Sequence, residues 1–115
     1  MKRKFLYFLI LLPIAAASIN AQQGGYVGPG ADVITVAEAR TLRDDMPVIL
    51  RGRILQFLGN ERYLFEDETG SIIIEIESRL WRNITVDEND LVEISGEIDR
   101  GFRQIEVEVD TIRKL

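Results

Sequence analysis

Apolar and polar residues alternate along most of the chain, which is the pattern of β-strands that bury one face. Five segments have this period, and a longer connection separates the third from the fourth. They are residues 48–55, 62–67, 71–77, 91–99 and 103–111. Turn-forming residues, including Gly59-Asn60-Glu61 and Glu68-Thr69-Gly70, separate the first three segments. The pattern therefore predicts three strands, a connection and two further strands.

A short helix is predicted before the first strand. Thr35 and Glu38 have the spacing of a capping box, in which each side chain accepts a hydrogen bond from the other residue's backbone amide. We expect the helix to end near Arg43, because Asp44 and Asp45 then supply turn chemistry.

Gly52 lies in the middle of the first strand, in phase with the apolar residues Val48, Leu50 and Ile54. A glycine there is typical of a bulge or a sharp bend, which lets one strand serve both halves of a closed barrel. Three strands, a connection and two strands, with a bent first strand, is the plan of the OB-fold. We therefore expect an all-β protein, a five-stranded OB-fold Greek-key barrel with a short N-terminal helix. The alternative is an open sheet packed on that helix.

Residues 1–21 differ in composition from the rest and predict a cleavable signal peptide. Three basic residues precede an apolar run over residues 5–14, and Ile19-Asn20-Ala21 ends in a small residue, as signal peptidase requires. The apolar run is too short for a stable transmembrane helix, and no cysteine follows it for lipid attachment. We expect an exported protein that begins at Gln22 and has no stable membrane anchor after cleavage. Residues 22–33 are predicted to be a flexible glycine-rich leader and residues 34–115 the OB-fold domain.

The composition of the processed chain excludes several functions. Cleavage would leave 94 of the 115 residues, with 11 basic residues, 19 acidic residues and a net charge of −8. We expect no nucleic-acid partner, because binding of phosphates relies on Lys and Arg. The chain has no His and no Cys, which removes imidazole bases, His-activated nucleophiles and zinc sites of the Cys/His kind. We expect no cofactor and no metal.

Two arginines border the loops that flank the usual OB-fold ligand site. Arg62 ends the loop at residues 58–62 and Arg103 ends the loop at residues 99–103, where both would suit an anionic group of a ligand. The alternative is that each pairs with an acid nearby in the sequence and contributes little. The predicted partners are Glu61 or Glu66 for Arg62, and Asp99 or Glu106 for Arg103.

Three other residues are candidates for ligand binding. Arg51 lies on the outward face of the first strand, where it would bind an anion or pair across the sheet with Glu93 or Glu97. Tyr63 is in phase with the core, and its hydroxyl is expected near the rim of the barrel. Trp81 lies in the long connection, where it would either plug the end of the barrel or stack on a sugar or peptide.

Acidic residues alternate with the core residues of the last three strands. They are Glu75, Glu77, Glu93, Glu97, Asp99, Glu106, Glu108 and Asp110. We interpret them as a solvated exterior, with binding of Ca²⁺, Mg²⁺ or a cationic peptide as the alternative. Residues 87–90 also hold three acids, but the residues of a calcium-binding loop do not follow them, so we predict a turn.

Short sequence landmarks across the chain resemble the bacterial OB-fold (BOF) family of periplasmic stress-tolerance proteins, the YgiW/YdeI type. The landmarks are Gly24-Gly25-Tyr26-Val27-Gly28-Pro29, Leu42-Arg43-Asp44-Asp45, Leu50-Arg51-Gly52, Tyr63-Leu64-Phe65-Glu66-Asp67 with Gly70, Trp81, and Gly96-Glu97-Ile98-Asp99. The resemblance implies a periplasmic OB-fold protein of stress tolerance with no established enzymatic activity.

Two functions remain open at this point. The first is a binding or adaptor protein of envelope stress tolerance that holds a glycan, a peptidoglycan fragment, a peptide or a partner protein, and is not an enzyme. The alternative is a small cell-wall hydrolase that works through paired carboxylates in a concave pocket. The two are distinguished by whether such a pair of carboxylates exists.

Overall fold

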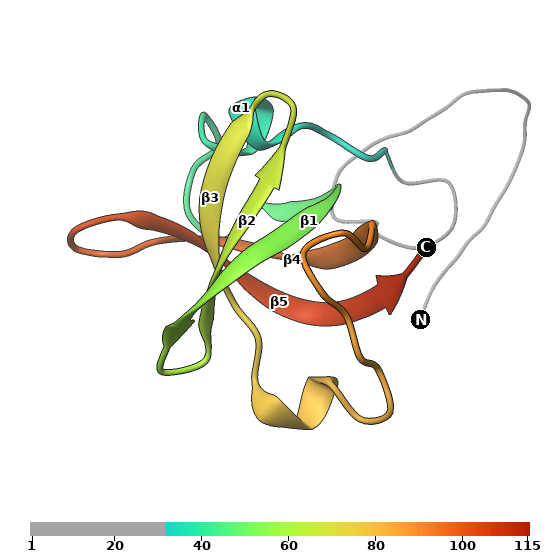
Figure 1. The fold of residues 1–115 in the computed structure, drawn as a ribbon. Coiled ribbons are helices and arrows are strands. Elements are labelled where there is room, and N and C mark those ends of the chain that lie inside the picture. The colour runs from blue at the N-terminus through green and yellow to red at the C-terminus, as the bar shows by residue number, and fades with distance from the viewer. Residues whose placement is uncertain (1–31) are drawn as a thin grey trace, which may run out of the picture. The chain divides into compact units, whose positions relative to one another are not determined.

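The computed structural model describes residues 32–115 (Figure 1). The predicted signal peptide, residues 1–21, and all but the last two residues of the predicted leader, residues 22–33, lie outside the described residues. The signal peptide and the leader therefore stay predictions.

The described residues form a closed barrel of five strands, with the strand order β1-β2-β3-β5-β4. The strands are β1 (Pro47–Gly59), β2 (Arg62–Asp67), β3 (Gly70–Glu75), β4 (Val92–Arg100) and β5 (Ile105–Lys114). All neighbouring strands are antiparallel except β3 and β5, which are parallel. The prediction of a five-stranded all-β barrel is confirmed, and the open sheet is wrong.

The two helical segments lie at opposite ends of the barrel (Figure 1). Helix α1 (Val36–Ala39) begins with the predicted capping box between Thr35 and Glu38, and the Asp67 carboxylate also accepts a hydrogen bond of 2.8 Å from the Val36 amide. The helix ends at Ala39, four residues before the predicted end near Arg43, and its buried residues are Val36 and Ala39. The 3-10 helix η2 (Ser78–Leu80) lies in the connection between β3 and β4.

Strand β1 changes partners at Gly52. Residues up to Gly52 pair with β4, and residues from Arg53 onward pair with β2. A side chain at Gly52 would collide with the Glu66 carbonyl and the Phe65 ring, so glycine is required here by the close approach of β2. The irregularities in register lie further along the strand, between Ile54 and Gln56 and between Phe57 and Gly59. The prediction of a strand shared by both halves is confirmed, but the bulge is not at Gly52.

Strand β5 is longer than predicted and changes phase. Val107 and Val109 are buried, but after a register shift opposite Ser95 and Gly96 the next buried residue is Ile112. The shift inserts one extra residue, which moves the following side chains to the opposite faces. Alternation read from the sequence therefore missed the end of this strand.

The core fills the inside of the barrel with aliphatic side chains and one aromatic ring. Phe65 is completely buried, and the two buried residues of α1 pack against the same cluster. Its largest buried side chains are Phe65, Leu50, Ile72, Ile74, Ile76, Ile94, Ile98, Val36, Val92 and Val107. Because side chains fill the interior, we look for a ligand site on the outer surface and the loops.

Candidate functional site

Three aromatic side chains from three different segments meet beside the second half of β1. Phe57 and Tyr63 are paired on β1 and β2, and their ring centroids are 5.2 Å apart. Trp81, directly after η2, contacts Tyr63 edge to face, with 5.6 Å between the ring centroids. Tyr63 and Trp81 also pack against the core, so their rings are held in place from below. The result is a series of rings with one side anchored and the other open.

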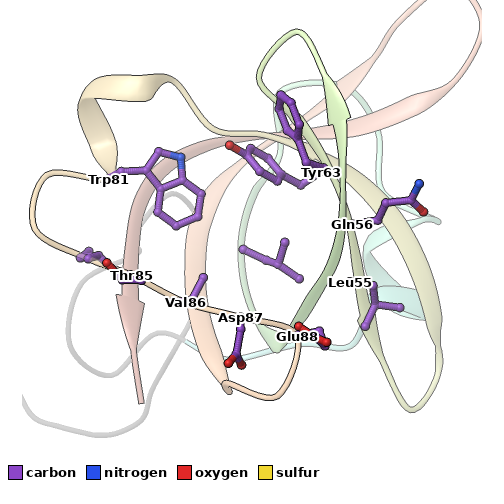
Figure 2. A pocket seen from close by; sticks show the side chains of 11 residues that line it. Leu55, Gln56, Tyr63, Trp81, Thr85, Val86, Asp87 and Glu88 are labelled. Atoms are coloured by element: carbon purple, nitrogen blue, oxygen red, sulfur yellow. The ribbon is translucent and has the colours of Figure 1, made fainter.

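The rings lie along a groove of about 460 Å³ between β1 and the β3–β4 connection. Figure 2 shows Tyr63 and Trp81 together at one end, Leu55 on the β1 side, and Asp87 and Glu88 along the rim. The lining residues are Ile54, Leu55, Gln56, Phe57, Tyr63, Trp81, Ile84, Thr85, Val86, Asp87 and Glu88. The groove is therefore apolar at its base and acidic at its edge, with no Lys or Arg in its lining.

Large apolar side chains are exposed beside this groove. Phe57 is 62% exposed, Leu58 43% and Leu55 40%, and all three lie within four residues of the second half of β1. Exposed apolar residues that gather in one place, in contrast to scattered ones, are typical of interaction sites. We call the lining residues together with Leu58 the aromatic groove.

The wall opposite β1 is fixed by hydrogen bonds. The Ile84 amide donates to the Trp81 carbonyl at 2.7 Å, and the Lys114 ammonium donates to the Thr85 carbonyl at 3.0 Å. Asp87 and Asp90 close a turn in which each residue's amide bonds the other, at 2.8 Å and 3.1 Å. The predicted turn at residues 87–90 is confirmed. These bonds fix the position of this wall relative to β5.

The structure brings together two of the five predicted site residues, Tyr63 and Trp81. Trp81 is half-buried against the core, as the plug interpretation expects, and it also lines the groove. Its role in ligand binding stays a prediction. Arg51 lies elsewhere and forms an ion pair of 3.0 Å with Glu93, which confirms the predicted cross-strand partner. Glu93 also binds Arg113 at 2.8 Å.

Arg62 is held by a buried acid and not by its neighbours in the sequence. Its Nε donates to Glu106 at 2.9 Å, and Glu75 lies 4.0 Å away. Glu61 and Glu66, the predicted partners, are wrong, because the partner comes from β5, across β3. Glu106 is only 7% exposed, so it is not part of a solvated exterior.

Burial alone would raise the pKa of the Glu106 carboxyl group. The hydrogen bonds from Arg62 and Gln104, together with the charge of Arg62, outweigh burial and hold the pKa below its ordinary value of 4.5. The folded state therefore binds this proton less well than the unfolded state, and the stabilisation is lost as the pH falls below 4.5.

Arg62→Ala is expected to lower the free energy of unfolding by about 1–3 kcal/mol, because it leaves the buried Glu106 carboxylate without its cation. Arg103 is exposed and forms no ion pair within residues 32–115, so Arg103→Ala should change stability by less than about 0.5 kcal/mol. Urea unfolding at pH 7 measures both. Equal stability of the two variants would contradict the structural role of Arg62.

A row of like charges crosses the outer face of β3, β5 and β4. Glu75 is paired with Glu108, and Glu108 with Glu97. Burial raises the pKa of the Glu108 carboxyl group above 4.5, and the charges of Glu75, Asp99 and Glu97 raise it further. Within residues 32–115, no group of acidic side chains has the arrangement of a metal site.

Glu108→Gln is expected to raise the free energy of unfolding at pH 7, because it removes a charge that its neighbours oppose. Because the pKa of Glu108 is raised by folding, the folded state binds this proton more tightly than the unfolded state. The resulting stabilisation is fully present below pH 4.5 and is lost as the pH rises through the folded pKa. The gain should therefore be smaller at pH 4 than at pH 7. Thermal melts at both pH values measure it, with the exposed Glu68→Gln as control. A gain of the same size at both pH values would contradict the assignment.

A second groove, of about 430 Å³, is lined by the three carboxylates of Glu66, Asp67 and Glu68. Burial would raise the pKa of the Asp67 carboxyl group, but bonds from Thr69 and from the Val36 amide outweigh it and lower the pKa. A glycosidase acid requires a raised pKa. Asp67 therefore has a structural role, and the carboxyl group with a raised pKa, Glu108, lies outside this groove.

Comparison with known proteins shows to which family the chain belongs. The model of a family described as "Bacterial OB fold (BOF) protein" matches residues 14–114. The chain belongs to the bacterial OB-fold family. It is 39% identical to Protein YgiW of Escherichia coli, over 98% of both chains. It is also 36% identical to the calcium-regulated OB-fold protein CarO of Pseudomonas aeruginosa, over 90% of this chain and 95% of CarO. The predicted family is confirmed.

Solved structures support the same fold. The structure of the hypothetical protein YgiW from Escherichia coli has a TM-score of 0.74 and 42% identity, and covers 81% of this chain and 100% of that one. The Stn1–Ten1 complex of Schizosaccharomyces pombe matches with a TM-score of 0.60 at 16% identity, over 76% of this chain and 79% of that one, which shows a shared fold alone. The names of these BOF relatives state no enzymatic activity. Within residues 32–115 of this BOF protein, no helix has the length and apolar character needed to cross a bilayer.

Sequence reasoning missed the β1 side of the aromatic groove. The predicted first strand ended at Leu55, so Phe57 and Leu58 were left unassigned or placed in a loop. The signal was present, because residues 55–58 read Leu-Gln-Phe-Leu and put two apolar side chains at outward positions. Outward apolar residues at the end of a strand are the feature that would have indicated a contact surface.

Proposed function

We propose that this BOF protein is a periplasmic binding or adaptor protein of envelope stress tolerance, which holds its ligand in the aromatic groove. The observation that carries the proposal is the series of rings at Phe57, Tyr63 and Trp81, in which Tyr63 and Trp81 pack against the core and Phe57 is exposed. Exported location is supported by the signal-peptide pattern of residues 1–21. The ligand classes that suit the groove are a glycan, a peptidoglycan fragment, a peptide or a partner protein.

The physical basis is that aromatic rings bury a large area at a small entropic cost, because they have few rotatable bonds. Tyr63 and Trp81 already lose most of their freedom against the core, so a ligand orders little on binding. The acidic rim argues against nucleic acid, since phosphates would approach Asp87 and Glu88 without a compensating cation in the lining. A role without catalysis is favoured by the structural use of Asp67 and Glu106.

Binding is tested by titration with Trp81 fluorescence as the readout, because Trp81 is the only tryptophan and lines the groove. The ligands are muropeptides, chito-oligosaccharides and short synthetic peptides. We expect at least one class to bind, and Phe57→Ala to weaken that binding by about tenfold. Phe102→Ala is the matched control, because Phe102 is a fully exposed aromatic residue on the β4–β5 loop. Equal affinities of both variants for every ligand would overturn the proposal.

Export is tested separately by the intact mass of the protein recovered from the periplasm. We expect a chain that begins at Gln22. A mature form that keeps residues 1–21 would contradict the predicted processing.

A further inference from the structure

The second half of β1 has a free edge. Residues 53–59 pair with β2, whereas β4 pairs only with residues 47–52 on the other side of the same strand. Within residues 32–115, no further backbone hydrogen bond reaches residues 53–59. Because alternate peptide groups of a strand point to opposite sides, those that point away from β2 have no protein partner here.

This edge has few charged residues to prevent strand pairing. Proteins commonly cover free edges, place charged residues or Pro on them, or twist them with bulges. Arg53 is the one charged residue of residues 53–59 and lies at their start, and register shifts lie between Ile54 and Gln56 and between Phe57 and Gly59. Residues 55–58 carry no charged residue and no Pro, and their exposed side chains include Leu55, Phe57 and Leu58. An accessible apolar edge of this kind is a template for another strand.

The aromatic groove runs beside this edge. Its lining joins residues 54–57 of β1 to residues 84–88 of the β3–β4 connection, with Tyr63 and Trp81 at one end (Figure 2). A strand added to the edge would direct every second side chain toward this apolar base. The side chains of Ile84 and Val86 supply further apolar contacts on the far wall.

Charge selects the chemistry of the added strand. The groove has Asp87 and Glu88 on its rim and no basic residue in its lining. A peptide that alternates apolar and basic residues would place the apolar ones on the rings and the basic ones near the rim. A second copy of this acidic chain would bring like charges together at the same rim, so it fits less well.

We propose that the free edge of β1 residues 55–59 receives an extended peptide as an additional strand, with apolar side chains in the aromatic groove and basic side chains at its acidic rim. The proposal rests on the proposed function and specifies its ligand class. Main-chain hydrogen bonds to the edge supply affinity, and the rings select the side chains.

The test uses the mature protein and a synthetic peptide of about seven residues that alternates Arg with Val or Phe. Amide hydrogen exchange, followed by NMR, is compared with and without the peptide. At saturation we expect the outward-facing amides of residues 55–58 to exchange at least about tenfold more slowly. A peptide of the same sequence, N-methylated at two adjacent central residues, loses one donor on each edge and should bind about tenfold more weakly.

Matched variants test the side-chain part of the proposal. Phe57→Ala should weaken peptide binding about tenfold, whereas Phe102→Ala should leave it unchanged. Glu88→Gln should weaken it about two- to fivefold at low salt, whereas the exposed Glu68→Gln, outside this groove, should not.

Three results would overturn strand addition. The first is peptide binding without protection of the β1 amides, and the second is binding of a saccharide but not of the peptide. Both leave the proposed binding function in place. The third is protection of the same amides in the free protein together with a concentration-dependent dimer, which assigns the edge to a second copy. Failure of every ligand to bind would overturn the proposed function as well.

Discussion

Gly52→Val is expected to destabilise the barrel by more than about 3 kcal/mol. A Cβ atom at this position would overlap the Glu66 carbonyl and lie 2.9 Å from Cζ of Phe65. The backbone of β2 cannot move away without breaking its pairing with β1 and β3, so the strain is not relieved. Thermal unfolding should show a melting temperature lower by more than about 12 °C.

The control for this experiment is Gly101→Ala on the β4–β5 loop. A Cβ atom there would lie 3.4 Å from the Gln104 carbonyl, which is close to an ordinary contact. We expect a change of less than about 0.5 kcal/mol. A Gly52→Val variant as stable as this control would mean that β1 and β2 do not approach each other at Gly52.

Phe65→Ala is expected to cost about 3–5 kcal/mol, because it empties the centre of the core. Phe65 is completely buried, and its ring also fills the space that Gly52 leaves open. Urea unfolding measures the loss, which is a large part of the total stability of a domain of this size. Phe57→Ala removes the same side chain from the outer surface, where it is 62% exposed.

The comparison of the two phenylalanines separates folding from binding. Phe57→Ala should change stability by less than about 0.5 kcal/mol, so that its effect on ligand binding reports the groove alone. A large loss of stability in Phe57→Ala would contradict its assignment to the contact surface. A small loss in Phe65→Ala would contradict the core described above.

The bend in β1 connects the fold of this BOF protein to its proposed function. One strand of 13 residues pairs with β4 over its first part and with β2 over its second part. The pairing with β4 ends at Gly52, so the corresponding edge of residues 53–59 is free. The same geometry that closes the barrel therefore exposes the edge and the aromatic groove.

The local pattern of residues was sufficient to predict the elements. Residues 62–67 form the predicted strand β2 with the same bounds, and Thr35 with Glu38 forms the predicted capping box. Both features depend on neighbours within a few residues, so the sequence specifies them directly. The bounds of β1 and β5 were less accurate, because a register shift interrupts the alternation in each strand.

Non-local pairing produced the features that the sequence analysis did not find. Glu106 was predicted to be solvated, but Arg62 and Gln104 cover it, and Arg62 comes from β2, across β3. Phe57 was not assigned to a site, because its contact with Tyr63 depends on the register of β1 and β2. A periodic pattern gives the face on which a side chain lies but not the residue opposite to it.

The sequence by itself determined an all-β domain of five strands, the order of those strands along the chain, and a surface without the residues of imidazole or thiolate chemistry. These properties follow from local period, turn residues and composition. Only the tertiary structure decided that Phe57, Tyr63 and Trp81 form one groove and that the outer edge of residues 53–59 is free. The physical reason is that barrel closure brings distant segments together, and the close approach at Gly52 fixes where β1 leaves one partner for the next.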